Sequence, residues 1–271
     1  MTRARTLIAR FVTGIALLLA GFLVYMYVES RPTAQARLAI QTDATVRVTV
    51  RPRDMLFEPV AVRRAAAGLL FLPGSPVDPI AYAPLARAIA ARGHSTAIVS
   101  LPYRGLASAK SRHLATRASE AIRALGAQRW VIAGHSRGGE FGSRLVLDNP
   151  GRFAALVLIA TTHPRSFSLV NTSVDVIQVS GDRDGTTSDD ELGAARARLP
   201  ASTRHVVISG ANHSQFGFYG WYPFDGTPTI SHASQIAQTV DILLATLGKA
   251  DSAAADAPRT DRHNDREGTQ D

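Results

Sequence analysis

The most informative stretch of the sequence is Trp130-Val131-Ile132-Ala133-Gly134-His135-Ser136-Arg137-Gly138-Gly139. Its four leading apolar residues predict a buried strand, and the pattern over 138–148 predicts a helix directly after the turn. Glycines two positions before and after Ser136 would allow strand and helix to approach closely around a strained serine. This strand–turn–helix context predicts that Ser136 is a nucleophile rather than part of a coincidental glycine turn.

Short apolar runs alternate with helix-like segments on both sides of this stretch. The runs cover 45–51, 55–60, 69–72, 96–100, 130–133, 155–160, 174–180 and 205–208, and the helix-like segments cover 80–92, 111–125, 138–148, 189–199 and 231–247. The first two runs predict a hairpin, and the later, continuous runs predict strands buried on both faces. The expected fold is α/β, with a doubly wound, mostly parallel eight-stranded sheet flanked by helices.

Candidate partners for Ser136 follow it in the chain. The run at 174–180 leads into Gly181-Asp182-Arg183-Asp184-Gly185, where a carboxylate would reach the edge of the sheet. We expect Asp184 to be the acid because its spacing leaves room for the chain to turn back over the site. Asp182 is the alternative, and both could instead only build the turn. His213 follows the last predicted strand on a loop and is expected to be the general base.

Two backbone amides are expected to stabilise an oxyanion. The amide of Arg137 stands at the start of the helix that follows Ser136. The run at 69–72 leads into Pro73-Gly74-Ser75-Pro76, in which glycine allows a tight turn and the second proline has no N–H to donate. Ser75 is therefore expected to supply the second amide, and an ordinary loop is the alternative.

These motifs resemble those of the α/β-hydrolase superfamily, whose catalytic residues follow one another as serine, acid and histidine. More closely, residues 73–85 (PGSPVDPIAYAPL) and 212–217 (NHSQFG) resemble motifs of small, lid-less bacterial members. The resemblance covers residues 45–248 and implies an α/β-hydrolase fold. It also implies that Ser136, Asp184 and His213 form the triad, with Arg137 and Ser75 as the oxyanion amides. Val174 follows the run ending at 160 by only 14 positions, so no sizeable lid is expected.

The expected activity is that of a carboxylesterase-like serine hydrolase acting on a small-molecule acyl substrate through an acyl-enzyme. No cofactor is implied, and no spacing of histidines and carboxylates resembles a metal site. One alternative keeps this chemistry and cleaves an amide, thioester or peptide bond. Another is a non-catalytic protein of the same fold, tethered to a membrane for binding. The oligomeric state is left open.

An uncharged apolar run covers residues 11–28 and has about the minimum length of a transmembrane helix. Arg3, Arg5 and Arg10 precede it, which predicts a cytoplasmic N-terminus over residues 1–10. We expect an uncleaved anchor, a linker over 29–44 and an extracytoplasmic catalytic domain over 45–248. Cleavage as a signal peptide near Ala34-Gln35-Ala36 would instead release a secreted or periplasmic protein.

The charge and cysteine content of the chain limit its possible partners and bonds. The net charge is +8, but its arginines are scattered, and only Lys110 and Lys249 are lysines. No cluster of basic residues with interleaved aromatics predicts a nucleic-acid surface. The chain has no cysteine, which excludes disulfides and thiolate sites. Residues 249–271 are polar and charged and are expected to be disordered.

The most aromatic segment covers residues 216–224 and directly follows the predicted base. Three interpretations are open. The segment could form a wall of an acyl pocket, it could lie at a lipid interface, or it could pack on the sheet as an ordinary long loop.

Overall fold

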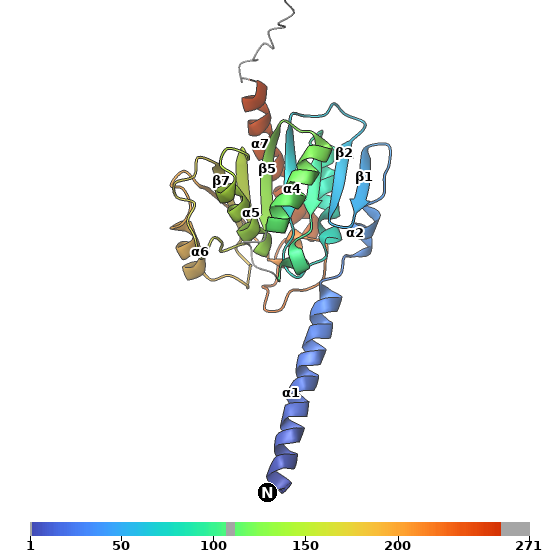
Figure 1. Ribbon diagram of the computed structural model, residues 1–271, viewed down its shortest axis with the longest axis vertical. Coiled ribbons are helices and arrows are strands. Elements are labelled where there is room, and N and C mark those ends of the chain that lie inside the picture. Colours follow the sequence, from blue (N-terminus) through green and yellow to red (C-terminus); the bar gives the residue numbers. More distant parts are fainter. Residues whose placement is uncertain (1, 107–111, 256–271) are drawn as a thin grey trace, which may run out of the picture.

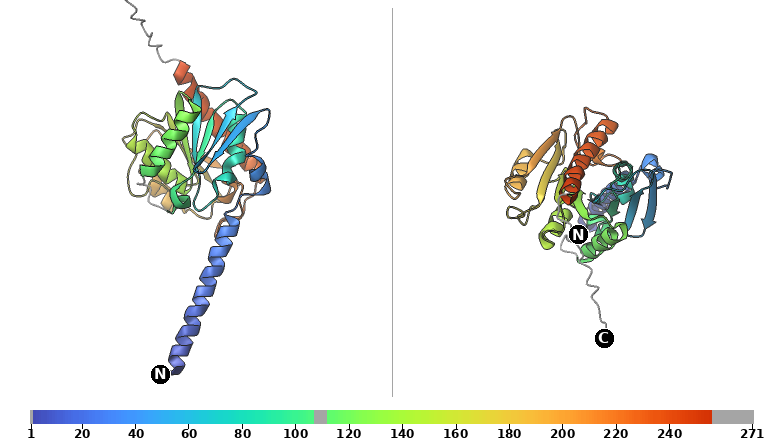
Figure 2. Two further views of the ribbon diagram at one scale, coloured as in Figure 1. Left: turned by 45° about the vertical axis from the view of Figure 1, so that its right-hand side comes forward. Right: turned by 90° about the horizontal axis from the view of Figure 1, so that it is seen from above.

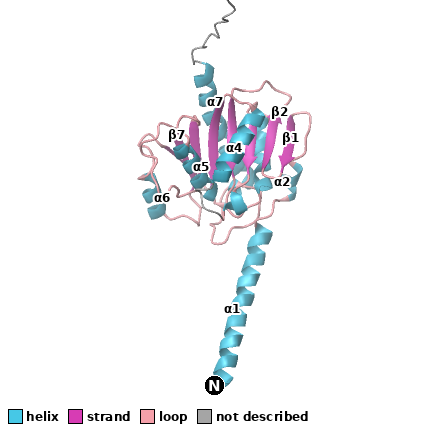
Figure 3. Cartoon of the chain, viewed as in Figure 1, coloured by secondary structure: helices cyan, strands magenta, loops and turns pink. Residues whose placement is uncertain are grey.

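An eight-stranded sheet forms the centre of the computed structural model, which describes residues 2–106 and 112–255 (Figure 3). Its strand order is β1-β2-β4-β3-β5-β6-β7-β8. Strand β2 pairs antiparallel with β1 and β4, and the other neighbours are parallel. This confirms the predicted doubly wound, mostly parallel sheet and its hairpin. The strands are β1 (Val46–Arg51), β2 (Asp54–Pro59), β3 (Ala67–Leu72), β4 (Thr96–Val99), β5 (Arg129–His135), β6 (Ala155–Ile159), β7 (Asp175–Gly181) and β8 (Arg204–Ile208).

Helices cover both faces of this sheet (Figures 1 and 2). Helices α4 (Arg112–Leu125) and α5 (Arg137–Asp148) pack on one face, while α3 (Ala83–Ala90) and α7 (His232–Ala255) pack on the other. Along β3, Leu69 and Phe71 enter the core beneath α3 and α7, whereas Leu70 and Leu72 enter the core beneath α4 and α5. Both faces are therefore buried, which explains why the central strands are continuous apolar runs.

Short elements decorate the edges of the sheet. They are α2 (Ala34–Leu38), α6 (Asp189–Arg196) and the 3₁₀ turns η1 (Pro79–Tyr82), η2 (Pro102–Gly105) and η3 (Ser214–Phe216). The described residues between β6 and β7 form no helix, in agreement with the expected absence of a sizeable lid. The connection between β6 and β7 therefore places no helix over the carboxyl edge of the sheet.

Helix α1 (Thr2–Glu29) extends away from the body of the molecule, as Figure 1 shows. Of the described part of the chain, it is the one helix long and apolar enough to cross a membrane by length and composition. The segment 29–44, expected as a linker, packs on the domain. Its helix α2 buries Ala36 completely, and Nε of Arg87 donates to the carbonyl of Ala39 at 2.9 Å.

Helix α7 continues past the boundary expected from the sequence and ends at Ala255. Residues 249–255 are therefore helical, which corrects the expectation of a disordered tail over that part. The reason is tertiary: Ala250 is buried, and the Asp251 carboxylate accepts a hydrogen bond of 2.9 Å from the amide of Ala67 at the start of β3. The rest of that prediction, 256–271, lies outside the described residues.

Candidate active site

Ser136 occupies a strained turn between β5 and α5. Its backbone has φ +51° and ψ −121°, a conformation that non-glycine residues rarely adopt. The flanking glycines make this turn possible. A Cβ at Gly134 would lie 2.3 Å from backbone atoms of Gly138, and a Cβ at Gly138 would lie 2.2 Å from the carbonyl oxygen of Leu72. The turn holds the half-buried Ser136 side chain at the edge of the sheet.

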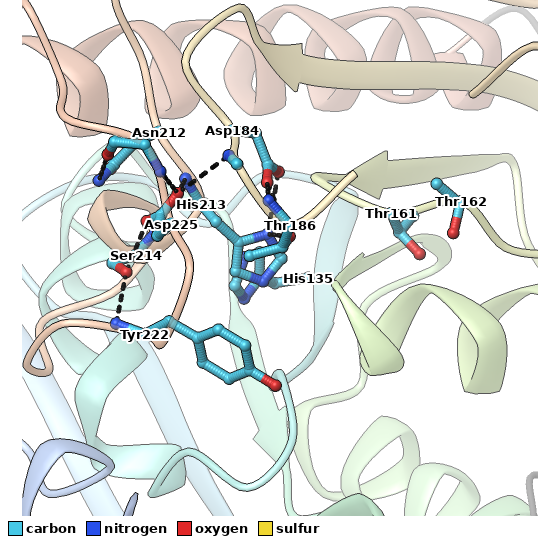
Figure 4. A network of polar contacts seen from close by, with 12 residues as sticks. His135, Thr161, Thr162, Asp184, Thr186, Asn212, His213, Ser214, Tyr222 and Asp225 are labelled. Carbon is cyan, nitrogen blue, oxygen red and sulfur yellow. Dashed lines mark hydrogen bonds and ion pairs between the residues drawn. The ribbon is translucent and has the colours of Figure 1, made fainter. Parts of the chain in front are cut away.

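His213 and Asp184 meet at this same edge from two different loops (Figure 4). Nδ1 of His213 is 2.9 Å from Oδ2 of Asp184. The two side chains are only 5% and 2% exposed, so water screens this pair weakly. An acid in this position can hold the imidazole in one tautomer and stabilise its charged form.

Thr186 joins this pair and was not recognised in the sequence. Its hydroxyl donates to Oδ1 of Asp184 at 2.7 Å, and its oxygen lies 2.9 Å from Nδ1 of His213. Its backbone amide also donates to the same carboxylate. Burial alone would raise the pKa of Asp184, but the hydrogen bonds from His213 and Thr186 outweigh it and lower that pKa. Asp184 is thus held in its charged form.

Asp182, the alternative acid, has other hydrogen-bond partners. Its carboxylate accepts hydrogen bonds from the amide of Gly210 at 2.6 Å and from the hydroxyl of Ser209 at 2.9 Å. These bonds lower its pKa, and the side chain is exposed. The structure therefore brings Asp184 to His213 and uses Asp182 to fasten the neighbouring loop.

A buried carboxylate, Asp225, holds the loop that carries His213, and no sequence pattern identified it. Its oxygens accept hydrogen bonds from the amides of His213 and Ser214 at 3.0 and 2.7 Å, and from the Ser214 hydroxyl at 2.7 Å (Figure 4). The amide of Gly185 donates to the same carboxylate at 3.3 Å. Asp225 therefore ties the loop of the acid to the loop of the base.

Asn212 fastens the other side of this loop. Its side-chain amide donates to the carbonyl of Gly226, and its backbone exchanges two hydrogen bonds with the side chain of Gln235 on α7. The first two residues of the motif at 212–217 thus have separate tasks. Asn212 anchors the loop, and His213 projects into the site.

Ser136 and His213 line one pocket of about 350 Å³. Thr161 and Thr162, which follow β6, and Tyr222 from the aromatic segment complete much of its wall. The ring of Tyr222 lies 5.5 Å from the ring of His213. The site is therefore open to solvent and already formed, with the expected nucleophile and base on a common surface.

The expected oxyanion donors lie beside Ser136. Arg137 is the first residue of α5, and Ser75 lines a second cavity together with Ser136 and Arg137. In the turn that contains Ser75, the Gly74 amide donates to the hydroxyl of Tyr82 at 3.0 Å. The amide of Gly74 is therefore used within the turn, and Pro76, which follows Ser75, has no N–H to donate.

His135 supports the site from below and was not expected to take part. It is fully buried, its ring centroid is 4.6 Å from that of His213, and its Nδ1 lies 2.8 Å from the hydroxyl of Tyr82. Burial, with the nearby charge of His213, holds the pKa of His135 well below its usual value. The ring of His135 is therefore held neutral where it packs against His213.

Within residues 2–106 and 112–255, no three histidine, aspartate or glutamate side chains are grouped so that they could hold a metal ion. The groups that lie at this edge of the sheet are a hydroxyl on Ser136, an imidazole on His213 and a buried carboxylate on Asp184.

The sequence matches the model of the Alpha/beta hydrolase family over residues 68–237, which is more than half of the chain. The chain belongs to the α/β hydrolase family. Residues 68–237 contain Ser136, Asp184 and His213, and they run from β3 into α7. No sequence among proteins of curated function matches the chain significantly.

Solved structures share this α/β hydrolase fold at low sequence identity. An alpha-beta serine hydrolase homologue from Coxiella burnetii has a TM-score of 0.51 and 16% identity, covering 76% of this chain and 100% of that one. The thioesterase domain from the curacin biosynthetic pathway has a TM-score of 0.53 and 12% identity, with 75% and 100% covered. A proline iminopeptidase from Mycobacterium smegmatis has a TM-score of 0.51 and 14% identity, with 78% and 100% covered. Their named activities differ, so the fold alone does not decide which bond is cleaved.

Proposed function

We propose that the protein is a membrane-anchored serine hydrolase that cleaves an acyl ester. One observation carries this proposal: a strained serine and a buried His213–Asp184 pair face one open pocket. Ser136 is the nucleophile, His213 the general base and Asp184 the acid that orients it. A protein that only binds would not need all three groups in this arrangement.

In the first half of the reaction, the Ser136 oxygen attacks the ester carbonyl while Nε2 of His213 takes its proton. The carbonyl oxygen becomes an oxyanion, which the amides of Arg137 and Ser75 stabilise. The C–O bond to the alcohol then breaks, and the protonated His213 gives its proton to the departing oxygen. An acyl group remains esterified to Ser136, and the alcohol leaves.

In the second half, His213 removes a proton from water, and the resulting hydroxide attacks the acyl carbon. The bond to the Ser136 oxygen breaks, His213 returns the proton to the serine, and a carboxylic acid is released. Asp184 stays charged throughout and stabilises the imidazolium. Thr186 holds the carboxylate in the orientation that this requires.

Helix α1 is proposed to be a retained membrane anchor with its N-terminus in the cytoplasm. The basic residues before the apolar run support this orientation. The segment after α1 supports retention, because cleavage near Ala36 would remove residues that pack on the domain. In particular, the carbonyl of Ser30 accepts a hydrogen bond from the amide of Asp78, and the amide of Thr33 donates to the carbonyl of Phe218.

A fluorophosphonate probe tests the nucleophile directly, because it bonds covalently to an activated serine. The full chain in detergent micelles should be labelled, and Ser136→Ala should abolish labelling. Ser202→Ala, at an exposed turn, is the matched control and should label like the wild type. Absence of labelling in folded wild-type protein would favour a binding protein over an enzyme.

A panel of soluble substrates with the same acyl group then identifies the bond. We expect the ester to be cleaved fastest, ahead of the corresponding thioester and amide. Faster cleavage of the thioester or the amide would retain the serine mechanism and overturn the assignment to esters.

A further inference from the structure

The second cavity beside Ser136 has the membrane helix as one of its walls. It measures about 830 Å³ and extends from Ser136 and Ser75 on the domain to Phe22, Leu23, Met26 and Tyr27 on α1. These four helix residues have the spacing of a single stripe on one face. The nucleophile therefore opens onto a space that is lined in part by a segment expected to lie in lipid.

The end of α1 is held firmly against the domain. The carboxylate of Glu29 accepts a hydrogen bond of 2.7 Å from the amide of Trp221, and its carbonyl accepts one of 2.8 Å from Gly220. The hydroxyl of Tyr25 donates to the carbonyl of Trp221 at 3.3 Å. The aromatic segment thus binds the end of the helix, so no flexible linker separates the site from the membrane.

The length of α1 places this cavity at the level of the bilayer. From Arg10 to Glu29 the helix rises about 28 Å at 1.5 Å per residue, close to the roughly 30 Å of a hydrocarbon core. Phe22 then lies about 10 Å along the helix from Glu29, within the leaflet nearest the domain. The mouth of the cavity along α1 therefore faces acyl chains rather than water.

Exposed apolar side chains surround this edge of the domain. Tyr103 and Leu106, in and just after η2, are 83% and 76% exposed, and Phe224 is 87% exposed. Leu106 lines the cavity of Ser136 and α1, and Phe224 lines the smaller pocket. Such side chains are unfavourable in water and would be accommodated by lipid at the end of the anchor.

The part of the cavity that the domain lines beside Ser136 is polar. Arg137, Glu140 and His163 line it beside Ser136. The arginine and glutamate form an ion pair at 2.5 Å. A ligand that fills the cavity therefore meets apolar side chains at one end and charged ones at the other, which matches an amphiphile with its ester group between the two.

We propose that this cavity admits the acyl chain of a membrane-embedded ester directly from the leaflet nearest the domain. This inference rests on the proposed hydrolase function and names its substrate class: a long-chain acyl ester of a membrane amphiphile. The chain lies along Leu23 and Met26, and the ester carbonyl reaches Ser136.

Filling the apolar end of the cavity tests this route. The full-length protein is placed in vesicles of ether-linked phosphatidylcholine, which offers no competing ester, together with a long-chain fluorogenic acyl ester. Leu23→Trp and Met26→Trp should each lower kcat/KM for this ester by about tenfold or more, because a few methylene contacts are lost. A soluble short-chain ester should be hydrolysed at the wild-type rate by the same proteins.

Val24→Trp is the matched control, since Val24 neighbours Leu23 but does not line the cavity. It should leave both activities unchanged. Equal activity of all variants on the embedded ester would overturn the proposed route, as would an equal loss on both esters. Hydrolysis of the soluble ester alone by the wild type would also overturn it while leaving the proposed function intact. Failure to cleave either ester would contradict the proposed function itself.

Discussion

Replacing Asp184 with asparagine removes one charge from a buried pair and leaves its shape almost unchanged. In the native site, Oδ2 of Asp184 lies 2.9 Å from Nδ1 of His213, and both side chains are nearly inaccessible to water. In the proposed reaction His213 takes the proton of Ser136, and the new imidazolium then faces this carboxylate. Asparagine cannot compensate that positive charge, so the transition state for acylation should rise in free energy.

The size of the effect follows from the separation of the charges. Two opposite unit charges with centres about 3.5 Å apart attract each other by roughly 5 kcal/mol at an effective dielectric constant of about 20. Each 1.4 kcal/mol changes a rate about tenfold, so losing this attraction corresponds to a factor of about 10³ or slightly more. An asparagine amide that donates to Nδ1 would also favour the wrong tautomer of His213, and this adds to the loss. We therefore expect kcat for Asp184→Asn to fall by about 10³- to 10⁴-fold.

The assay compares Asp184→Asn with Asp182→Asn on a soluble ester, with thermal unfolding as a check of folding. Asp182 is exposed, and its hydrogen-bond partners are Ser209 and Gly210. Its substitution should therefore change kcat by less than about threefold. Equal losses in the two variants would refute the reasoning. A small loss in Asp184→Asn, with folding unchanged, would show that the charge of Asp184 does not support the reaction.

Two further predictions concern stability. Burial, together with Arg165 and Arg137, lowers the pKa of His163 to about 4. A histidine in the unfolded chain binds its proton near pH 6.5. This difference should therefore lower the free energy of unfolding by about 3 kcal/mol as the pH falls from 7 to 4. In urea unfolding, His163→Gln should lose correspondingly less stability than the wild type between pH 7 and pH 4. The same pH dependence in both proteins would contradict this. Gly138→Ala should destabilise the protein by more than about 3 kcal/mol because its Cβ would meet backbone atoms. Gly193→Ala on α6, where a Cβ meets nothing within 4 Å, should be neutral or slightly stabilising, and equal melting temperatures for the two variants would refute the packing argument.

The order of strands and helices was predictable because each buried element has a local signature. A strand buried on both faces must be apolar along its whole length, and each central strand was found within two residues of its observed ends. The predicted end of α7 was wrong because it depends on a contact that has no local signature. Lys249 and Asp251 are polar and resemble a solvated tail, yet Asp251 is bonded to the start of β3. No local pattern reports a partner so distant along the chain.

Within the candidate site, the sequence alone determined where the proposed reactive groups occur along the chain. A serine in a strained turn requires glycines on both sides, so Ser136 is visible in a few residues. Which acid meets His213 was decided only by the tertiary structure, because Asp182 and Asp184 are two positions apart and their side chains turn to different partners. The spacing of these two residues along the chain does not show which way each side chain points in the folded protein.

The same reason applies to the groups that support the site and to its surroundings. Asp225 bonds to two loops at once, and Thr186 bridges Asp184 and His213; both roles exist only after the loops have packed together. The apolar segment at 11–28 was evident from its composition, since a long uncharged run needs no context. That its last turns line a cavity shared with Ser136 depends on how the aromatic segment and Glu29 dock, and contacts between segments nearly 200 residues apart are decided by packing in three dimensions.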